Sequence, residues 1–437
     1  MPDAQPKMEE IVSLCKRRGF IFPSSEIYGG LNSSYDYGPL GSELKRSVKD
    51  YWWKSMTQAH TDIFGLDSAI LMAPKIWKAS GHLDNFTDPM IDCKSCKSRF
   101  RADHLPPDTT ACPKCKEPTL TDARNFNLMF KTFMGPLEDQ ANTVFLRPET
   151  AQGIYVNYQN VLTTSRSKLP FGIAQIGKAF RNEITPGNFT FRTREFEQME
   201  MQYFVKPGDD EKEISRWKDF RQTWYEKLNI QSDRLRFHEH KGNELAHYAK
   251  AAFDIEYNFP FGWSELEGIH NRTDFDLTRH QTHSGKNLQY FDEATKEKFI
   301  PYIIETSAGC DRAMLCILCD AYAQEEARTV LRFAPFIAPI QTAVLPLVRK
   351  DGLADMAANL TQALQKKFRV QMDTTASIGK RYRRQDEVGT PFCVTLDYET
   401  KENQTVTIRH RDSMQQERIA MDQVEAYLMP HLQMPLQ

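Results

Sequence analysis

The chain has 437 residues, which is enough for two or three domains with a sizeable buried core. Its formal net charge of −2 excludes a uniformly basic surface, so any contact with nucleic acid must come from local patches. The sequence opens without a cationic apolar signal and has no apolar run long enough to span a membrane, so we expect a cytoplasmic protein.

Two helices are predicted near the N-terminus. The first covers residues 7–19 and ends at a glycine. In the second, residues 40–56, apolar side chains recur every four residues and share one helix face: Leu40, Leu44, Val48, Trp52 and Met56. Such a stripe belongs either to the core or to a subunit interface, with Lys45 outside it. Residues 63–77 then read as a strand that stops at Pro74.

Four of the nine cysteines form two Cys-x2-Cys pairs with fifteen residues between them: Cys93, Cys96, Cys112 and Cys115. This spacing suits tetrahedral Zn²⁺, and four thiolates leave no open coordination position for catalysis. We therefore expect a structural zinc ribbon as an insert at residues 88–120. Between the pairs, Arg101 is a candidate to reach back to a substrate carboxylate. The other five cysteines lie among apolar neighbours, which is typical of small core residues.

A strand that turns into a helix is predicted after the insert. Glu149 lies at the corner, and Thr150 is a reasonable N-cap for the helix. Functional groups are often displayed at corners of this kind, so Glu149 is a candidate binding residue.

A hairpin is predicted over residues 177–204, around a Pro-Gly-Asn turn. Arg181 and Glu183 lie on its first arm. On the second arm, even-numbered offsets place Arg192, Phe196 and Glu200 on one face of the strand. A cation, an aromatic ring and acids facing one cleft are what a bent nucleoside triphosphate would need. The alternative is an exposed charged hairpin with one packed phenylalanine.

The polar residues 207–256 favour helix and read as a peripheral insertion. Its histidines could suggest a metal site, but no acid lies at ligand spacing, so we interpret them as solvated surface: His238, His240 and His247.

Two further strands precede an apolar helix. Glu265 and Glu267 alternate as on a strand that begins near Phe261. Residues 299–304 form the second strand, which enters the helix through a bend of small residues with Arg312 in the first helical turn. This arrangement suits a phosphate or an adenine.

The C-terminal part reads as a separate α/β module. Residues 333–341 contain two prolines and are interpreted as a linker, after which strands and helices alternate over a common domain size. The densest basic run of the chain lies in this module and contains an aromatic residue. It is either a solvated helix face or a contact for RNA.

In this order, these features resemble the class II aminoacyl-tRNA synthetases. The helix and the strand that ends at Pro74 are similar to the first motif of that class, which builds the dimer interface in the family. The second motif is matched by Phe180-Arg181-Asn182-Glu183 together with Arg192, Phe196 and Glu200, and the third by Gly309-Cys310-Asp311-Arg312. Five stretches further resemble the homodimeric glycyl-tRNA synthetases: SGHLDNFTDPM, FRADHL, LRPETAQGIY, ELEGIHNRTDFDL and SIGKRYRRQDEVGTP.

The resemblance covers nearly the whole chain and implies an α/β (α+β) fold, in which a class II antiparallel sheet is flanked by helices. The implied catalytic domain spans residues 1–334, with the zinc-ribbon-like insert at 88–120 and the peripheral helical insertion at 207–256. An α/β anticodon-binding domain follows at residues 335–437. The implied activity is the ATP-dependent attachment of glycine to tRNA(Gly) through a glycyl-adenylate, by a homodimer that uses ATP with Mg²⁺.

The resemblance also implies roles for individual residues. Arg181 would hold the α-phosphate and the amino-acid carboxylate, Glu183 would read the adenine edge, and Phe196 would stack under the ring. Arg192 and Arg312 would clamp the γ-phosphate, because the planar fork of arginine binds phosphate bidentately and also stacks. For Mg²⁺ the candidate ligand is Glu265. For the glycine ammonium group the candidates are Glu149, Glu200 and Glu305. We also expect Glu305 and Ser307 to fill the space of a larger substrate side chain.

The resemblance implies a set of candidate binding residues for each of the three ligands. ATP is assigned to Arg181, Asn182, Glu183, Phe191, Arg192, Thr193, Arg194, Glu195, Phe196, Glu265, Leu266, Gly309, Cys310, Asp311 and Arg312. Glycine is assigned to Arg101, Glu149, Phe196, Glu197, Gln198, Met199, Glu200, Glu305, Thr306, Ser307, Ala308 and Gly309. Transfer RNA is assigned to Lys380, Arg381, Tyr382, Arg383 and Arg384.

Two other interpretations remain open from the sequence. A synthetase-derived protein that binds nucleic acid without catalysis would lose the ATP-binding arginines, and this chain keeps them. A class II synthetase for another small amino acid, such as proline, serine or threonine, is distinguished by pyrophosphate exchange with each amino acid in turn.

Overall fold

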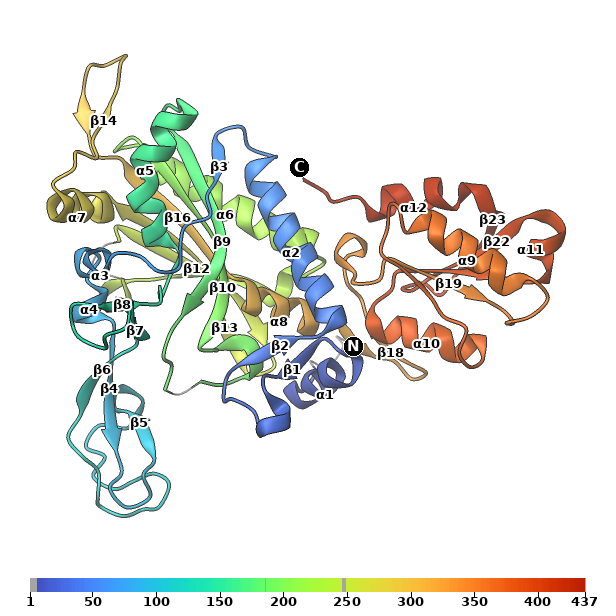
Figure 1. Cartoon of the computed structure of the whole chain (residues 1–437), viewed down its shortest axis with the longest axis horizontal. Helices are drawn as coiled ribbons and strands as arrows, with labels where there is room; N and C mark the ends of the chain where they lie inside the picture. Colours follow the sequence, from blue (N-terminus) through green and yellow to red (C-terminus); the bar gives the residue numbers. More distant parts are fainter. Residues whose placement is uncertain (1–5, 185, 246–248, 437) are drawn as a thin grey trace.

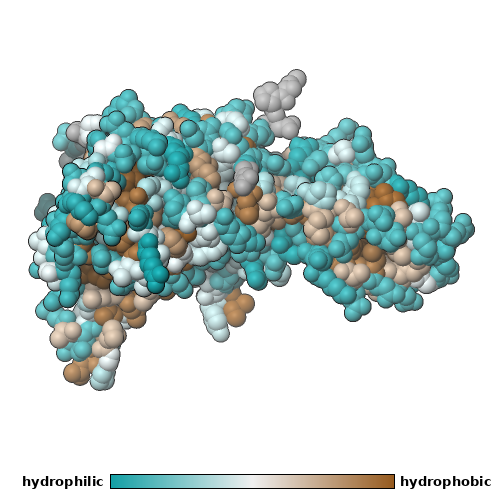
Figure 2. All heavy atoms as spheres, turned by 90° about the horizontal axis from the view of Figure 1, so that it is seen from above, coloured by the Kyte–Doolittle hydropathy of each residue, from teal (hydrophilic) through white to brown (hydrophobic). Residues whose placement is uncertain are grey.

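The computed structural model describes residues 6–184, 186–245 and 249–436. They form a large body, a small lobe that projects from it and a C-terminal body (Figure 1). His247, one of the histidines assigned to the surface, lies outside the described residues. In the described part of the chain, no helix combines the length and apolarity that crossing a bilayer requires. The visible surface is mostly hydrophilic, with small apolar patches on both bodies (Figure 2).

The large body is organised around a seven-stranded sheet with the order β11-β12-β13-β16-β10-β9-β3. Its strands pair antiparallel except for β3, which is parallel to β9. The predicted mixed fold with an antiparallel sheet and flanking helices is confirmed. In chain order, the strands of this sheet are β3 (Ile63–Gly65), β9 (Phe171–Phe180), β10 (Glu195–Val205), β11 (Leu235–Glu239), β12 (Ala251–Phe259), β13 (Gly262–Thr273) and β16 (Tyr302–Gly309).

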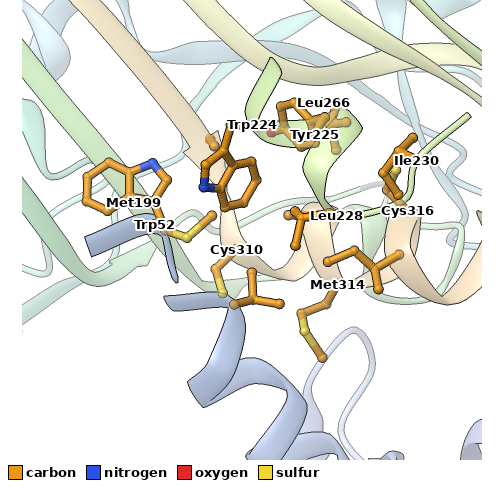
Figure 3. Packing of buried hydrophobic residues seen from close by; sticks show 14 of the residues in the cluster. Trp52, Met199, Trp224, Tyr225, Leu228, Ile230, Leu266, Cys310, Met314 and Cys316 are labelled. Atoms are coloured by element: carbon orange, nitrogen blue, oxygen red, sulfur yellow. The ribbon is translucent and has the colours of Figure 1, made fainter. Parts of the chain in front are cut away.

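Helices cover the two faces of this sheet unequally. One face packs against α2 (Pro39–Thr57), α6 (Asp210–Lys227) and α8 (Cys310–Ala321), and this layer holds the main core. Figure 3 shows Trp52, Trp224 and Met314 from these three helices in that core. The opposite face is covered in part by α5 (Ala151–Ser165) and α7 (Phe275–Ser284). The uncovered part of that face holds a cavity that is lined mostly by polar and charged side chains.

The predicted N-terminal helices are confirmed. Helix α1 (Met8–Arg18) ends at Gly19, whose φ of 75° lies in the left-handed region that glycine adopts without strain. The apolar stripe of α2 faces the core of its own chain, since Leu44, Val48, Trp52 and Met56 are all fully buried. The stripe therefore does not form a subunit interface.

Two predictions of secondary structure are wrong. Residues 207–256 are not a peripheral helical insertion, because α6 buries Trp217 and Trp224 in the main core, while β11 and β12 extend the central sheet. Of the strand predicted over residues 63–77, β3 contains only three residues, and Pro74 begins the short helix α3 (Pro74–Ala79) instead of ending a strand.

The projecting lobe contains the predicted insert. Its three-stranded sheet has the order β5-β4-β6, and it is preceded by the short helix α4 and followed by a two-stranded ribbon. The elements are α4 (His82–Asn85), β4 (Thr87–Asp92), β5 (Arg99–Arg101), β6 (Arg124–Asn127), β7 (Lys131–Phe133) and β8 (Thr143–Phe145). Three other ribbons lie on the large body, namely β1 (Ile21–Pro23) with β2 (Tyr35–Tyr37), β14 (Tyr290–Phe291) with β15 (Lys298–Phe299), and β17 (Tyr322–Gln324) with β18 (Thr329–Leu331).

The C-terminal body is a five-stranded sheet with the order β20-β19-β21-β22-β23, in which β19 is parallel to both neighbours. The segment predicted to be a linker is not loose, because Phe333, Phe336 and Ile337 are buried in the core of the large body. The elements of this body are β19 (Thr342–Pro346), α9 (Leu353–Leu364), β20 (Val370–Met372), α10 (Ile378–Val388), β21 (Phe392–Leu396), α11 (Tyr398–Asn403), β22 (Thr405–His410), β23 (Gln416–Ala420) and α12 (Val424–Leu432).

Candidate active site

A cavity lies on the uncovered part of the central sheet. Its floor consists of β10, β13 and β16, and its rim consists of the loop from β9 to β10 and the start of α8. The two arms of the predicted hairpin pair as β9 and β10, but a long loop joins them instead of a tight turn. Arg181, Glu183 and Arg192 therefore lie in this loop and not on the strands, and all three line the cavity.

Strand β10 separates its side chains as the alternation predicts. Phe196, Gln198 and Glu200 point into the cavity. Glu197 and Met199 point to the opposite face, where Lys49 binds the Glu197 carboxylate and Met199 joins the main core. The structure therefore places two residues of the predicted glycine set away from the cavity.

A bulge in β13 reverses the alternation that the sequence suggests. Glu265 pairs with Glu256, Glu267 pairs with Ile255, and Leu266 between them has no partner in the register. Glu265 therefore faces the cavity, whereas Glu267 points to the other face and is fully buried.

Beyond the bulge, three residues of β13 that the sequence interpretation missed line the cavity: Gly268, His270 and Arg272. The signal that could have found them is the alternation of small, imidazole and cationic side chains in the stretch GIHNR.

Strand β16 supplies the third part of the floor. Glu305, Ser307 and Gly309 line the cavity, whereas Thr306 and Ala308 are buried on the opposite side. The predicted bend at these residues is wrong, since β16 continues to Gly309 and α8 begins at the next residue.

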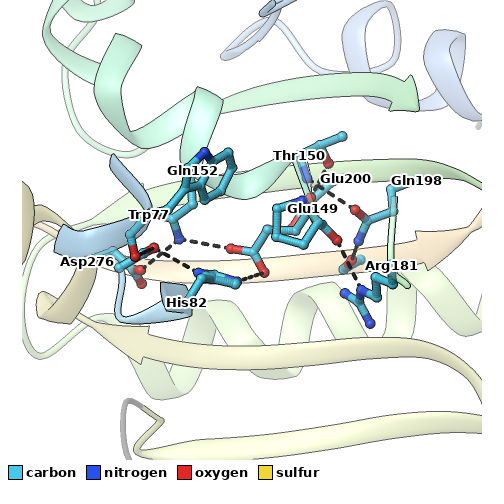
Figure 4. Close-up of polar contacts among 12 residues, drawn as sticks. Trp77, His82, Glu149, Thr150, Gln152, Arg181, Gln198, Glu200 and Asp276 are labelled. Atoms are coloured by element: carbon cyan, nitrogen blue, oxygen red, sulfur yellow. Dashed lines mark hydrogen bonds and ion pairs between the residues drawn. The ribbon is translucent and has the colours of Figure 1, made fainter. Parts of the chain in front are cut away.

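Three carboxylates converge at the inner end of the cavity: Glu149, Glu200 and Glu305. The first and second lie close together in Figure 4. Glu149 Oε2 lies 3.3 Å from His82 Nε2, and Glu149 Oε1 accepts a hydrogen bond of 2.9 Å from Gln152.

The other two carboxylates differ in their partners. The Thr150 hydroxyl donates to Glu200 and does not cap α5, so the predicted N-cap bond is absent. Glu305 Oε2 forms a 2.7 Å ion pair with Nη1 of Arg272.

These partners give the three acids different charge states. Burial disfavours a charge on Glu149, but His82 outweighs burial and lowers the pKa of Glu149 to about 2. Burial is likewise outweighed at Glu305, where Arg272 lowers the pKa. At Glu200, burial and the neighbouring Glu305 both raise the pKa well above its usual value. The cavity therefore holds two carboxyl groups whose surroundings favour the charged form, beside one, Glu200, whose surroundings favour the protonated form.

Three arginines and two aromatic rings form the opposite end of the cavity, and two of these arginines lie over the rings. The guanidinium of Arg181 lies 5.3 Å from the centre of the Phe196 ring, and its Nε donates to the carbonyl of Pro148. The guanidinium of Arg312 lies 4.5 Å from the Phe191 ring. Cations held over aromatic rings at these distances are ready to bind phosphate or to stack on a base.

The arginines differ in how they are held. Arg312 Nη1 also forms a 3.0 Å ion pair with Glu265 Oε2. Arg192 lines the same end, and its side chain forms no hydrogen bond or ion pair with the described residues, although its backbone forms a β-bridge with Gly187. It is therefore available to an anion.

Asp311 anchors the helix that carries Arg312. Its carboxylate accepts hydrogen bonds from the Tyr37 hydroxyl at 2.5 Å, from Lys45 Nζ at 2.8 Å and from the backbone N–H of Glu197 at 2.8 Å. Lys45 was expected to lie on the outer, solvated side of α2, but its side chain is largely buried in these ion pairs. Asp311 also borders the cavity, but its three hydrogen bonds show that it holds the start of α8 in place.

Several residues in the predicted sets do not face the cavity. Glu195 is exposed and binds Lys178, while Asn182 borders a separate groove. Arg194 donates to the carbonyls of Glu183 and Asn32 and so holds the loop. The side chains of Leu266 and Cys310 belong to the main core. Arg101 lies on the insert, where it binds Asp88 at 3.2 Å and Asp103 at 2.6 Å. Thr193, by contrast, borders the cavity as predicted.

The four paired cysteines form a cluster in the insert. All four sulfur atoms lie within 4.8 Å of one another, with Cys93 to Cys115 and Cys96 to Cys112 each at 3.6 Å. Tetrahedral zinc with Zn–S bonds of about 2.3 Å separates its sulfurs by about 3.8 Å. The backbone N–H groups of Cys96 and Cys115 point to Cys93 and Cys112, which is the arrangement that stabilises thiolate ligands. The donor set therefore fits zinc.

The basic run on α10 is only partly exposed. Arg381 is 2% exposed, and its Nη1 donates to the carbonyls of Pro346 and Asp373. The prediction that it contacts RNA is therefore wrong, because it holds the C-terminal body together. Tyr382 packs against the sheet and its hydroxyl bonds to Thr395.

The remaining residues of the basic run also differ in exposure, since one makes a structural contact and two are exposed. Arg384 binds the Asp373 carboxylate at 2.5 Å. Lys380 and Arg383 are exposed. The surface that this helix offers to a polyanion is therefore narrower than the sequence suggests.

Comparison with known proteins agrees with this geometry. Residues 131–321 match the family described as tRNA synthetase class II core domain (G, H, P, S and T), and residues 341–429 match the anticodon binding domain. The chain is 60% identical to the glycine–tRNA ligase of Treponema denticola, over 96% of each chain. It is 53% identical to that of Lysinibacillus sphaericus, over 98% of this chain and 100% of the relative. The glycine–tRNA ligase of Borreliella burgdorferi is 56% identical, over 97% of each chain. The predicted resemblance is confirmed, and the chain belongs to the glycine–tRNA ligase family of the class II aminoacyl-tRNA synthetases.

Proposed function

We propose that the protein activates glycine with ATP and transfers the glycyl group to tRNA(Gly). This proposal rests mainly on one observation, namely that the cavity has an acidic end and a cationic, aromatic end. Three carboxylates gather at the inner end, and three arginines with two aromatic rings gather at the outer end. An ammonium group fits the first end, and a nucleoside triphosphate fits the second. Relatives named glycine–tRNA ligase over nearly their whole length support the same activity.

The acidic end suits the ammonium group of glycine. Glu149 and Glu305, whose pKa values are lowered, carry the charge that attracts it, and Glu200 lines the same cavity as a further acceptor. Ser307 restricts the space beside the substrate, and its hydroxyl accepts a 3.3 Å hydrogen bond from Gln198. We propose that Ser307 and Glu305 exclude a substrate side chain by sterics, which is an inexpensive way to discriminate against larger amino acids.

The cationic end suits a bent ATP molecule. In the proposal, Phe196 and Arg312 sandwich the adenine, Arg181 neutralises the α-phosphate, and Arg192 and Arg312 bind the γ-phosphate. Glu265 would hold Mg²⁺ with the nucleotide, and it fits because its half-exposed carboxylate lies at the cavity mouth and offers oxygen ligands. When bound, the ion would neutralise charge on the departing pyrophosphate.

The chemistry follows from this placement. A carboxylate oxygen of glycine attacks the α-phosphorus, an O–P bond forms, and the bond to pyrophosphate breaks with the electron pair leaving on pyrophosphate. A terminal ribose hydroxyl of the tRNA then attacks the glycyl carbonyl carbon and forms an ester bond. The bond from that carbon to the phosphate oxygen breaks, AMP leaves with the electron pair, and the hydroxyl proton passes to solvent. The first step needs no strong base, since its nucleophile is already ionised. Orientation and neutralisation by Arg181 therefore supply the acceleration.

Other parts of the chain have proposed roles that fit this activity. The cysteine cluster would hold a structural zinc ion, which requires free thiolates and so fits a cytoplasmic location. Residues 1–334 would form the catalytic domain and residues 335–437 the anticodon-binding domain, with Lys380 and Arg383 toward tRNA. A homodimer is proposed as well, supported by apolar side chains exposed between β1 and β2: Ile27, Tyr28 and Leu31.

ATP–pyrophosphate exchange tests the proposed function. The purified protein is assayed with glycine, alanine, serine, proline and threonine separately, and zinc is measured on the same sample. We expect exchange with glycine alone. The Ser307→Gly variant should gain exchange with alanine, whereas exchange with serine or proline by the wild type would assign the cavity to another amino acid. Absence of exchange with every amino acid would favour a protein that binds nucleic acid without catalysis.

A further inference from the structure

A row of acidic and imidazole side chains crosses the central sheet from the cavity to the sheet edge. Glu305 on β16 is the direct register partner of His270 on β13. His270 Nδ1 lies 3.5 Å from Glu305 Oε2, and its Nε2 lies 3.9 Å from Oδ1 of Asp254 on β12. Asp254 Oδ2 in turn lies 2.8 Å from Nε2 of His240, which follows β11. The row therefore connects a cavity residue to two strands that the cavity itself does not include.

His270 is the member of this row that touches the cavity and lacks an assigned role. Burial disfavours a charged ring, but Asp254 and Glu305 outweigh burial and raise the pKa of His270 to about 9. The ring is therefore a cation at neutral pH, held between two carboxylates. Its Nδ1 is buried and has no hydrogen-bond partner in the part of the chain that the structure describes, so its contact with Glu305 is one of charge.

The backbone leaves space for this ring at one residue. A Cβ atom at Gly268 would lie 2.8 Å from Cε1 and 3.0 Å from Nε2 of His270. Real Cβ atoms are not found at the shorter distance, so any larger residue at this position would displace the ring. Gly268 has no positive φ and borders no tight turn, so clearance for His270 is the steric requirement that its surroundings reveal.

Two cations contact the same oxygen of Glu305. Arg272 Nη1 lies 2.7 Å from Oε2, and His270 contacts that oxygen from β13 as well. Both cations therefore hold one oxygen of this carboxylate, while Glu200 lies close enough in the same cavity for each acid to shift the pKa of the other. An ammonium group that enters the acidic end of the cavity carries the charge that Glu305 attracts.

We propose that His270 is a positioning residue that turns Glu305 toward the ammonium group of glycine, and that Asp254 and Gly268 hold the ring in place. This inference rests on the proposed function. His270 acts through Glu305 and takes no part in the transfer of the phosphoryl or glycyl group. Its loss therefore weakens the binding of glycine and leaves the binding of ATP unchanged.

The test uses the full-length protein in ATP–pyrophosphate exchange, with KM measured separately for glycine and for ATP. His270→Gln removes the charge and keeps a polar side chain of similar length. We expect its KM for glycine to rise by about 10- to 100-fold, which is the range for a displaced substrate-binding group, with no change in KM for ATP. Gly268→Ala should reproduce this split because it displaces the same ring. His410→Gln, on β22 of the C-terminal body, is the matched control and should leave both values unchanged.

The double variant Gly268→Ala/His270→Gln separates a shared cause from general damage. If both changes act through the ring, the double variant is no worse than His270→Gln alone. Additive losses would overturn the inference, and so would an equal rise in KM for ATP or an unchanged KM for glycine in His270→Gln. Failure of the wild-type protein to exchange with glycine would instead refute the proposed function, so the two failures are distinguishable.

Discussion

The buried ion pair between Arg221 of α6 and Glu267 of β13 stabilises the face of the central sheet that lies opposite the cavity, and this contribution can be tested. Both side chains are fully buried, and Glu267 accepts hydrogen bonds from Arg221 Nε at 2.6 Å, from Arg221 Nη2 at 3.0 Å and from the Tyr225 hydroxyl at 2.8 Å. In the Arg221→Met variant, Glu267 keeps only the tyrosine and becomes an uncompensated buried charge. We expect a loss of about 3–5 kcal/mol in the free energy of unfolding.

Urea unfolding followed by tryptophan fluorescence measures this loss, since Trp217 and Trp224 lie on the same helix as Arg221. The matched control is the double variant Arg221→Met/Glu267→Leu, which replaces both charges by apolar groups and should recover to within about 1 kcal/mol of the wild type. A single-variant loss below about 1 kcal/mol, as an exposed pair gives, would refute the reasoning. A double variant less stable than the single one would refute it as well.

Three further predictions concern protonation, metal and RNA. KM for glycine should fall as the pH rises through the raised pKa of Glu200, because this carboxyl must lose its proton to attract an ammonium group by charge; a Glu200→Gln variant that keeps this dependence would contradict the assignment. Cys112→Ser should lower the zinc content measured by atomic emission, while Cys316→Ala, in the core, should retain it. Lys380→Glu/Arg383→Glu should weaken tRNA binding and lower its salt slope by about 2, with unchanged pyrophosphate exchange; an unchanged slope would remove this helix face from the tRNA contact.

The sequence predicted the elements whose signal is local. The four-residue spacing of apolar side chains in α2 corresponds to a stripe that is fully buried, and the alternation of β10 correctly separates Phe196 and Glu200 from Met199. These predictions succeed because each depends only on the spacing of side chains along a single helix or strand. The spacing of the cysteines likewise predicted a cluster whose sulfur atoms do meet.

Other features depend on contacts between distant segments, so they were not predictable from the periodicity of apolar and polar side chains within a single element. The bulge at Leu266 shifts β13 by one residue, so a strict alternation assigns Glu267 to the wrong face and misses His270 and Arg272. The polar composition of residues 207–256 suggested a peripheral segment. The carboxylate that allows Arg221 of α6 to be buried belongs to Glu267 of β13, which lies outside this segment. In the same way, the charge of Arg381 gave no sign that backbone carbonyls surround it.

A crystal structure with a non-hydrolysable sulfamoyl analogue of glycyl-adenylate tests the central claim most directly. We expect the ammonium group to lie within hydrogen-bond distance of Glu149, Glu200 and Glu305, and the adenine to lie between Phe196 and Arg312. An ammonium group bound outside these three carboxylates, or an adenine stacked elsewhere, would refute the proposed division of the cavity into an acidic and a cationic end.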